Sequence, residues 1–137
     1  MRFHEPYIIS EIGLNHNGSI EEAYKLIEES KKANCNAVKF QIRSEACLKA
    51  DPKNMEIGQQ YVYQYILSTF LNFNQYEKLI EFARNLKIDV IVSCWDIDSL
   101  LFAHKNKIKT LKIASADLTN LLMIETAFEY FDNFVMF

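Results

Sequence analysis

Short apolar runs rich in β-favouring residues alternate along this chain with longer segments whose apolar residues recur at helical spacing. Most of the short runs lack the polar alternation of a sheet with one wet face, so they are typical of parallel strands buried on both faces. Five strands are expected, approximately Tyr7–Ile12, Ala37–Ile42, Asp89–Ser93, Thr110–Ala114 and Phe134–Phe137. The pattern predicts an α/β fold of about five βα units.

Four helices are expected between these strands, each preceded by a residue that caps helix N-termini. Ser19 with Glu22, and Asn74 with Glu77, have the spacing of a capping box, and Asp96 opens the third helix. The fourth helix is expected over residues 121–130, with Asn120 as its cap. Each helix has an apolar face that suits packing on a sheet.

The segment between the second strand and its helix is unusually long. About 30 residues, Arg43–Phe73, stand where two to six would suffice. A short helix is expected there over Gln59–Thr69. Such an insertion either covers a substrate or packs on a neighbouring chain, and the sequence leaves both open.

Composition excludes several classes of function. The net charge of −3 leaves no basic stripe for a nucleic acid or an anionic membrane surface. No apolar run approaches the roughly 20 residues that span a bilayer, so a cytoplasmic protein with a small-molecule partner is expected. Three cysteines without CxxC spacing and three scattered histidines indicate neither a disulfide framework nor a metal site complete within the chain.

Polar residues gather where the predicted strands end, which is the catalytic face of a parallel barrel. They are Glu11, Asn15, His16, Lys39, Gln41, Ser93, Lys112, Ser115 and Asp117. Turn chemistry and helix capping account for Gly18 and Ser19. They do not require an imidazole, so a hydrogen-bonding role toward a ligand or a loop is favoured for Asn15 and His16.

Lys39 and Gln41 are two residues apart and therefore share one face of their strand. A buried ammonium needs an anionic partner, and the candidates are Glu11 on the neighbouring strand or a bound anion. A purely structural Lys39–Glu11 pair is the alternative to a binding site. Lys112 and Ser115 form a second corner suited to phosphate, unless Lys112 only extends to solvent.

Three segments in order resemble the sialic acid synthase family: residues 11–18 (EIGLNHNG), 37–41 (AVKFQ) and 112–117 (KIASAD) followed by Thr119 and Asn120. The resemblance covers essentially the whole chain. It implies a (β/α)8 TIM barrel of which residues 1–137 are the incomplete N-terminal portion. The C-terminal half of the barrel and the family's antifreeze-like domain would then be absent.

The resemblance also implies a carbon–carbon bond-forming transferase. Members of the family condense phosphoenolpyruvate with an N-acetylated amino sugar aldehyde, typically N-acetylmannosamine, to give a nine-carbon 2-keto acid and phosphate. They require Mn²⁺ or Mg²⁺, whose histidine ligands would lie beyond this chain, and they are commonly homodimers. The neuraminic, legionaminic and pseudaminic acid pathways remain open, although residues 11–18 look more like the first two.

By the same resemblance, Lys39, Lys112 and Ser115 would hold the phosphate and carboxylate of phosphoenolpyruvate. Gln41 would contact substrate, and Glu11 would orient or deprotonate a reacting group. Asp117 would contact the sugar or the centre where the new bond forms.

One segment departs from the family pattern. Ser93-Cys94-Trp95-Asp96 stands where Ser-Thr-Pro-Phe-Asp is common, so Cys94 replaces a threonine that contacts phosphate. Either Ser93 or Cys94 is expected to face the ligand.

The chain alone is expected to be inactive, because the metal ligands are missing. Two other functions are considered. One is a Schiff-base aldolase that uses Lys39 or Lys112 as an amine nucleophile. The other is a non-catalytic remnant or binding module.

Overall fold

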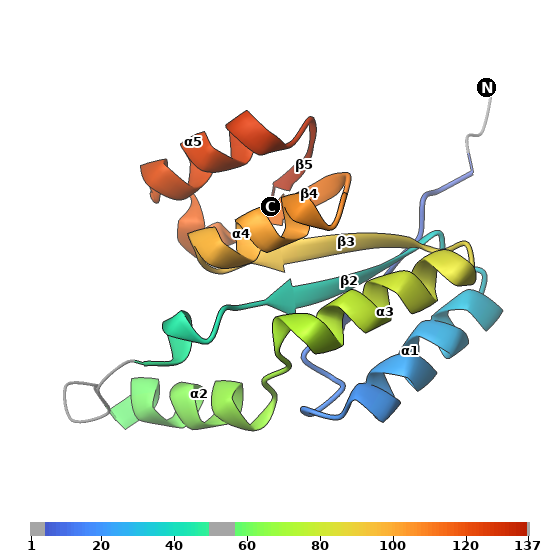
Figure 1. The fold of residues 1–137 in the computed structure, drawn as a ribbon, viewed down its shortest axis with the longest axis horizontal. Helices are drawn as coiled ribbons and strands as arrows, with labels where there is room; N and C mark the ends of the chain where they lie inside the picture. Colours follow the sequence, from blue (N-terminus) through green and yellow to red (C-terminus); the bar gives the residue numbers. More distant parts are fainter. Residues whose placement is uncertain (1–4, 50–56, 137) are drawn as a thin grey trace.

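The computed structural model describes residues 5–49 and 57–136, which alternate between strands and helices (Figure 1). The elements are β1 (Ile9–Gly13), α1 (Ile20–Lys32), β2 (Ala37–Ile42), α2 (Ile57–Ser68), α3 (Phe73–Asn85), β3 (Asp89–Cys94), α4 (Ile97–Lys105), β4 (Thr110–Ile113), α5 (Leu121–Tyr130) and β5 (Asn133–Met136). Short 3-10 helices occupy Ala46–Leu48 and Ser115–Asp117. All five predicted strands are confirmed to within two residues, except that Phe137 lies outside the described residues.

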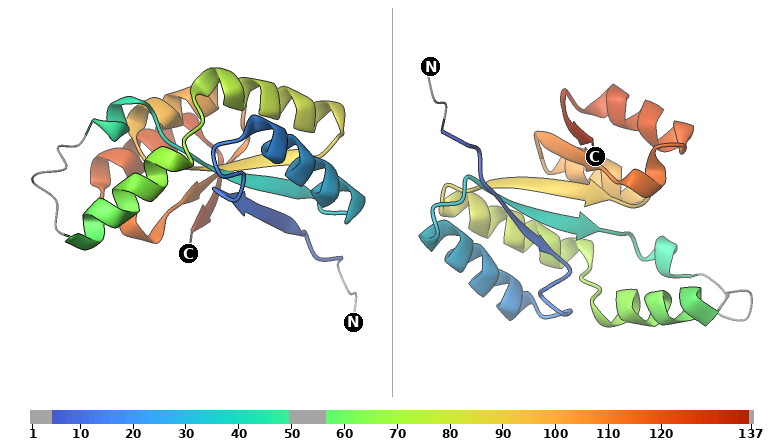
Figure 2. Two further views of the ribbon diagram at one scale, coloured as in Figure 1. Left: turned by 90° about the horizontal axis from the view of Figure 1, so that it is seen from below. Right: turned by 180° about the vertical axis from the view of Figure 1, so that it is seen from behind.

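The five strands form one parallel sheet in the order β1-β2-β3-β4-β5. Helices α1, α3, α4 and α5 connect them and lie on the same side of the sheet (Figure 2). A doubly wound sheet reverses its strand order at a switch point and carries helices on both faces. A sheet that adds every strand to the same edge is instead the arrangement that closes into a barrel, so the predicted N-terminal portion of a TIM barrel is confirmed.

The hydrophobic core lies between the sheet and these helices. Val38, Phe40 and Ile42 of β2 point into it and are fully buried, as are Leu79 and Ile80 of α3. Because side chains alternate along a strand, the other residues of each strand point to the opposite, inner face. That inner face receives the polar residues considered below.

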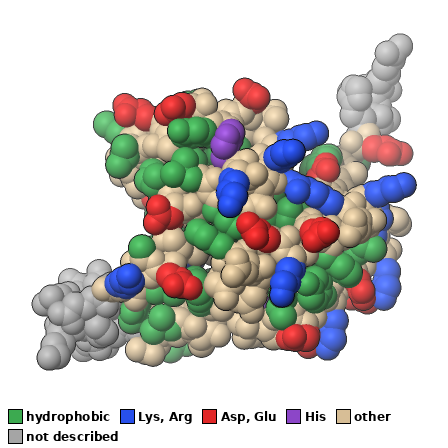
Figure 3. Space-filling model, viewed as in Figure 1, with side chains coloured by type: hydrophobic (Ala, Val, Ile, Leu, Met, Phe, Trp, Pro, Cys, Tyr) green, Lys and Arg blue, Asp and Glu red, His purple; other side chains and the backbone are tan. Residues whose placement is uncertain are grey.

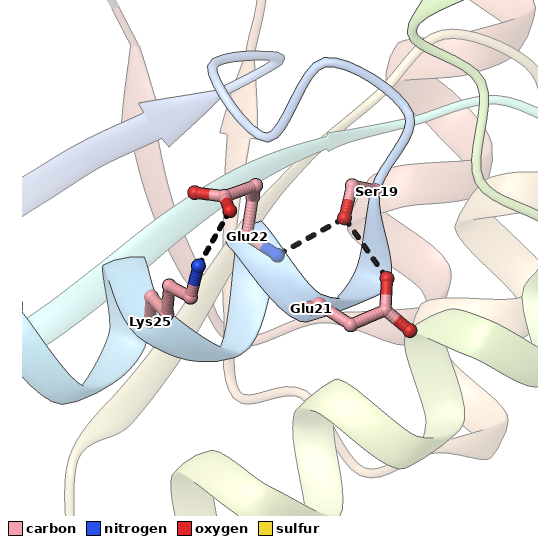
Figure 4. Close-up of polar contacts among 4 residues, drawn as sticks. All are labelled: Ser19, Glu21, Glu22 and Lys25. Carbon is pink, nitrogen blue, oxygen red and sulfur yellow. Dashed lines mark hydrogen bonds and ion pairs between the residues drawn. The ribbon is translucent and has the colours of Figure 1, made fainter.

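Helix α1 begins with half of the predicted capping box (Figure 4). The hydroxyl of Ser19 accepts a hydrogen bond from the Glu22 backbone N–H at 3.2 Å, as expected. The Glu22 carboxylate does not reach back to Ser19, because it pairs with Lys25 one turn further along at 2.7 Å. Ser19 donates its own proton to Glu21 at 2.9 Å.

The N-cap of helix α3 lies two residues before the predicted one. Asn72, not Asn74, accepts from the Gln75 backbone N–H at 3.0 Å, and the Gln75 side chain accepts from the Asn72 N–H at 2.9 Å. The prediction of Asn74 with Glu77 is therefore wrong. Asn72 and Gln75 are three residues apart, as are Asn74 and Glu77, so the sequence does not distinguish the two pairs. In the structure, Asn74 is exposed inside the first turn of the helix.

Three other predictions about local structure are confirmed. The Asp96 side chain accepts from the Ser99 backbone N–H at 2.7 Å and opens α4. The Asn120 side chain accepts from the Met123 N–H at 3.2 Å and opens α5. The helix expected within the long second loop is α2.

The outer surface differs from one helix to the next (Figure 3). Acidic and basic side chains are interspersed over α1 and α3, whereas hydrophobic side chains gather over α5, where Leu121, Leu122 and Phe128 are exposed. In the described part of the chain, no helix is long and apolar enough to cross a membrane.

Candidate active site on the inner face of the sheet

Strand register arranges the inner polar residues in two rows across the sheet. Glu11 of β1 is the neighbour of Lys39 of β2. One pleat further along, Gln41 is the neighbour of Ser93 of β3, which is in turn the neighbour of Lys112 of β4. The structure thus brings together five residues that the sequence places far apart.

Lys39 and Glu11 form an ion pair through Nζ and Oε2. Lys39 is only 9% exposed, whereas the side chain of Glu11 is 53% exposed. The intramolecular partner expected for the buried ammonium is therefore confirmed. Because the Glu11 side chain is half exposed, a ligand on the inner face can reach the ion pair. The pair can therefore both stabilise the sheet and take part in binding.

Gly13 brings Glu11 and Gln41 close to each other. It has a φ of +55°, and a Cβ placed on it would lie 3.1 Å from Glu11 Oε1 and 3.4 Å from Gln41 Nε2. The absence of a side chain at Gly13 leaves room for both groups over the end of β1. A carboxylate, an ammonium and an amide therefore meet at one point of the inner face.

The structure decides between Ser93 and Cys94. Ser93 points to the inner face, and its buried Oγ has no hydrogen-bond partner among the described residues. Cys94 points the other way into the core, where its thiol lies 3.4 Å from the Ser99 carbonyl oxygen and burial raises its pKa. Of the two residues expected as alternatives, only Ser93 lies on the inner face, because strand alternation turns Cys94 toward α4.

The corner after β4 holds Ser115 and Asp117 on a short 3-10 helix. Ser115 is exposed. The Oδ1 atom of Asp117 accepts from the Asn120 side chain at 3.4 Å, while its buried Oδ2 has no hydrogen-bond partner within the described part of the chain. This carboxylate oxygen is an acceptor available to a ligand hydroxyl or amide.

His16 does not lie at the mouth of the barrel. It is fully buried beneath its loop, where its ring lies 6.3 Å from that of Phe40 and 6.4 Å from that of Tyr76. Its Nδ1 accepts from the Gly18 backbone N–H at 3.2 Å, and burial lowers its pKa. Of the two roles expected for His16, the structure shows the hydrogen bond to its own loop, whereas Asn15 is exposed on the same loop.

Two residues at the rim of the inner face were missed by the sequence analysis. The guanidinium of Arg43 stacks over the ring of Trp95 at 4.1 Å from its centroid. Position 43 continues the alternation of Lys39 and Gln41, and position 95 that of Ser93. The same alternation, continued one residue beyond the end of each strand, predicts that both side chains face the inner side.

One large cavity of the structure lies away from these residues. The cavity of about 520 Å³ lined by Tyr7, Asp89 and Lys109 lies at the opposite, amino-terminal edge of the sheet. Across residues 5–49 and 57–136, no group of three or more His, Cys, Asp or Glu side chains could hold a metal ion.

Comparison with known proteins agrees with this arrangement. A model of the NeuB family matches residues 26–136. An N-acetylneuraminate-9-phosphate synthase of Drosophila melanogaster is 33% identical over 130 residues, covering 88% of this chain and 34% of that protein. An N,N'-diacetyllegionaminic acid synthase of Legionella pneumophila is 30% identical, with 84% of this chain and 34% of that protein covered.

A solved structure gives the same result. The N-acetylneuraminic acid synthetase of Leptospira borgpetersenii superposes with a TM-score of 0.78 at 26% identity, covering 90% of this chain and 41% of the other. The chain spans about a third of the length of the curated relatives that it matches. It belongs to the NeuB family, the family of the N-acetylneuraminate (sialic acid) synthases.

Proposed function

We propose that the protein containing this chain condenses phosphoenolpyruvate with an N-acetylated amino sugar aldehyde. The products would be a sialic-type nonulosonic acid and inorganic phosphate. The observation that carries the proposal is the inner face itself: Gln41, Ser93 and Lys112 are successive register neighbours, and Lys39 lies one pleat before Gln41 on β2. Two cationic side chains and hydroxyl and amide groups on one face suit a substrate with a phosphate and a carboxylate.

The roles proposed for the residues follow from their positions. Lys39, Lys112 and Ser115 would bind the two anionic groups of phosphoenolpyruvate, and Gln41 with Ser93 would donate hydrogen bonds between them. In the reaction, C3 of phosphoenolpyruvate attacks the aldehyde carbon, whose oxygen takes up a proton. Water then adds at C2, and phosphate leaves as the tetrahedral intermediate collapses to the ketone.

Two carboxylates would bind or transfer protons during this reaction. Asp117 Oδ2 is buried and available as an acceptor for the sugar. Glu11, held in place by Lys39, would orient a reacting group or take its proton. No step of this scheme needs a covalent nucleophile from the protein.

Binding of phosphoenolpyruvate to the 137-residue chain tests the proposal directly. Titration calorimetry or NMR is expected to show saturable binding that Lys39→Met and Lys112→Met each weaken at least about 10-fold, the loss of one charged hydrogen bond. Lys25→Met is the matched control, since Lys25 is an exposed lysine on α1 paired with Glu22. Equal binding by the inner-face variants and the control would contradict the proposal.

Catalysis by the isolated chain is a separate matter. We propose that it does not turn over, because its described residues form no metal site and it spans a third of its relatives. Phosphate release with phosphoenolpyruvate, N-acetylmannosamine and Mn²⁺ is expected to stay at background. Robust turnover would show that this part of the proposal is wrong.

The Schiff-base alternative predicts a different result. Borohydride reduction in the presence of pyruvate would trap an adduct on Lys39 or Lys112 if either acted as an amine nucleophile. The synthase proposal expects no increase in mass. The cytoplasmic location and the homodimer stay predictions, and the three possible amino sugar pathways stay open.

A further inference from the structure

Arg43 and Trp95 form a third polar row beyond the two already described. Ile42 and Cys94 are the last register pair of β2 and β3, and the Trp95 backbone N–H donates to the Ile42 carbonyl at 3.2 Å. Arg43 and Trp95 therefore face each other across neighbouring strands, one pleat beyond Gln41 and Ser93. At about 3.3 Å per residue, this row lies roughly 7 Å from the row of Gln41 and 13 Å from that of Lys39.

Stacking does not satisfy the hydrogen-bonding groups of the two side chains. A cation–π contact uses the faces of the guanidinium and the indole, whereas their N–H groups point outward in the planes of the rings. Arg43 Nη1 and Trp95 Nε1 are both buried, and neither has a hydrogen-bond partner in residues 5–49 and 57–136. Two unpaired buried donors at the same rim are costly unless an acceptor meets them.

Among the described residues, neither nearby carboxylate forms a hydrogen bond with these two donors, although Asp117 has an unpaired oxygen, Oδ2. Asp96 and Asp117 are both near the guanidinium, and they partly oppose the effect of burial, which lowers the pKa of Arg43. Asp96 is already occupied, because its two oxygens accept from the Ser99 and Ser44 backbone N–H groups at 2.7 and 2.9 Å. The three ion pairs found in the described part of the chain do not include Arg43.

We propose that the stacked Arg43–Trp95 pair is a second anion-binding point of the site, which binds a phosphate oxygen of a substrate through Nη1 and Nε1. This inference rests on the proposed function and deepens it. The phosphate is either that of phosphoenolpyruvate or one carried on the far end of the amino sugar. The distance of about two pleats from Lys39 is compatible with a group displaced from the reacting centre toward the mouth.

Trp95 provides its own reporter, because it is the single tryptophan of the chain. The indole N–H therefore gives one resolved signal in a ¹H–¹⁵N NMR spectrum. The 137-residue chain is titrated at constant ionic strength with phosphoenolpyruvate, N-acetylmannosamine 6-phosphate and uncharged N-acetylmannosamine. A phosphate-bearing probe is expected to move the indole signal saturably, and the uncharged sugar is not.

Variants separate this contact from general binding. Arg43→Gln is expected to weaken binding of the effective probe at least 10-fold, so that the indole signal moves only at correspondingly higher probe concentrations. Arg43→Lys keeps the positive charge but loses the planar guanidinium, so it should weaken binding of the probe less than Arg43→Gln does. Arg84→Gln is the control, since Arg84 lies at the far edge of the sheet, where it bonds the Asn106 carbonyl.

Each outcome has a definite meaning. The probe that moves the indole identifies the source of the phosphate, and a response to phosphoenolpyruvate that is lost in Lys39→Met assigns it to that substrate. If the Lys39 and Lys112 amide signals move while the indole does not, the inference is overturned and the proposed function stands. An indole titration with an unchanged midpoint in Arg43→Gln also overturns it, and no shift with any probe contradicts both.

Discussion

At the scale of single residues, His16 shows how burial converts a polar side chain into a pH-dependent element of stability. Burial lowers its pKa from the ordinary value of 6.5, so the folded state favours the neutral imidazole. The unfolded chain binds this proton more readily, and stability is therefore full above pH 6.5 and is lost as the pH falls toward the folded-state pKa. The loss should be visible between pH 7 and 5.

Substitution of His16 by Asn tests this effect. An Asn oxygen can accept from the Gly18 N–H in place of Nδ1 but does not titrate in this range. The melting temperature of the wild type is expected to fall more steeply from pH 7.5 to 5.5 than that of His16→Asn. Parallel profiles would show that the imidazole is not the titrating group.

The residues of the site were predictable to the extent that strand geometry decides them. Alternation placed Lys39 and Gln41 on one face, and the same rule explains Ser93 and Lys112. It does not extend to loops, which is why His16 was expected at the mouth and found in the core. Arg43 and Trp95 were missed because the pleat continues past the last ladder hydrogen bond.

At the scale of elements, the start of α3 distinguishes two asparagines that the sequence makes equally plausible. Asn72 takes part in both hydrogen bonds of the capping box, whereas Asn74 is exposed within the first turn. Asn72→Ala is expected to cost about 1 kcal/mol of unfolding free energy, while Asn74→Ala should be close to neutral. Urea unfolding of the two variants measures the difference, and equal losses would contradict the assignment of the cap.

Element types were easier to predict than element ends. Apolar spacing alone located every described strand and the four crossover helices, because a buried face needs its period over the whole element. The ends depend on one or two hydrogen bonds, such as the choice of Glu22 between Ser19 and Lys25. Two such hydrogen-bond partners are nearly equal in energy, and the choice between them depends on three-dimensional contacts that cannot be predicted from the sequence.

Gly18 links two elements that are distant in the sequence. It has a φ of +77°, and a Cβ placed on it would lie 2.5 Å from the carbonyl oxygen of Ser68 at the end of α2. Gly18→Ala is therefore expected to destabilise the chain by more than about 1 kcal/mol, from both strain and the backbone clash. Thermal unfolding checks this, with Ala substituted at exposed Asn15 of the same loop as the control.

At the scale of the whole molecule, the Lys39–Glu11 ion pair allows the contribution of Lys39 to folding to be separated from its contribution to binding. The reason is that Lys39 is nearly buried, whereas Glu11 is half exposed. Removing Glu11 leaves a nearly buried ammonium unpaired, whereas removing Lys39 leaves a carboxylate that is half exposed to water. Glu11→Gln is therefore expected to cost about 1–3 kcal/mol of unfolding free energy. Lys39→Met should change it by less than about 1 kcal/mol, because methionine fills the same volume without a charge to desolvate.

The two variants are informative together. If Lys39 is kept for binding rather than for folding, Lys39→Met retains stability yet loses phosphoenolpyruvate, and the double variant unfolds like Lys39→Met alone. Denaturant unfolding and calorimetry on the same samples measure both properties. A large loss of stability in Lys39→Met would instead identify the pair as a structural feature of the sheet, since an ammonium kept only for ligand binding contributes little to folding once its desolvation is counted.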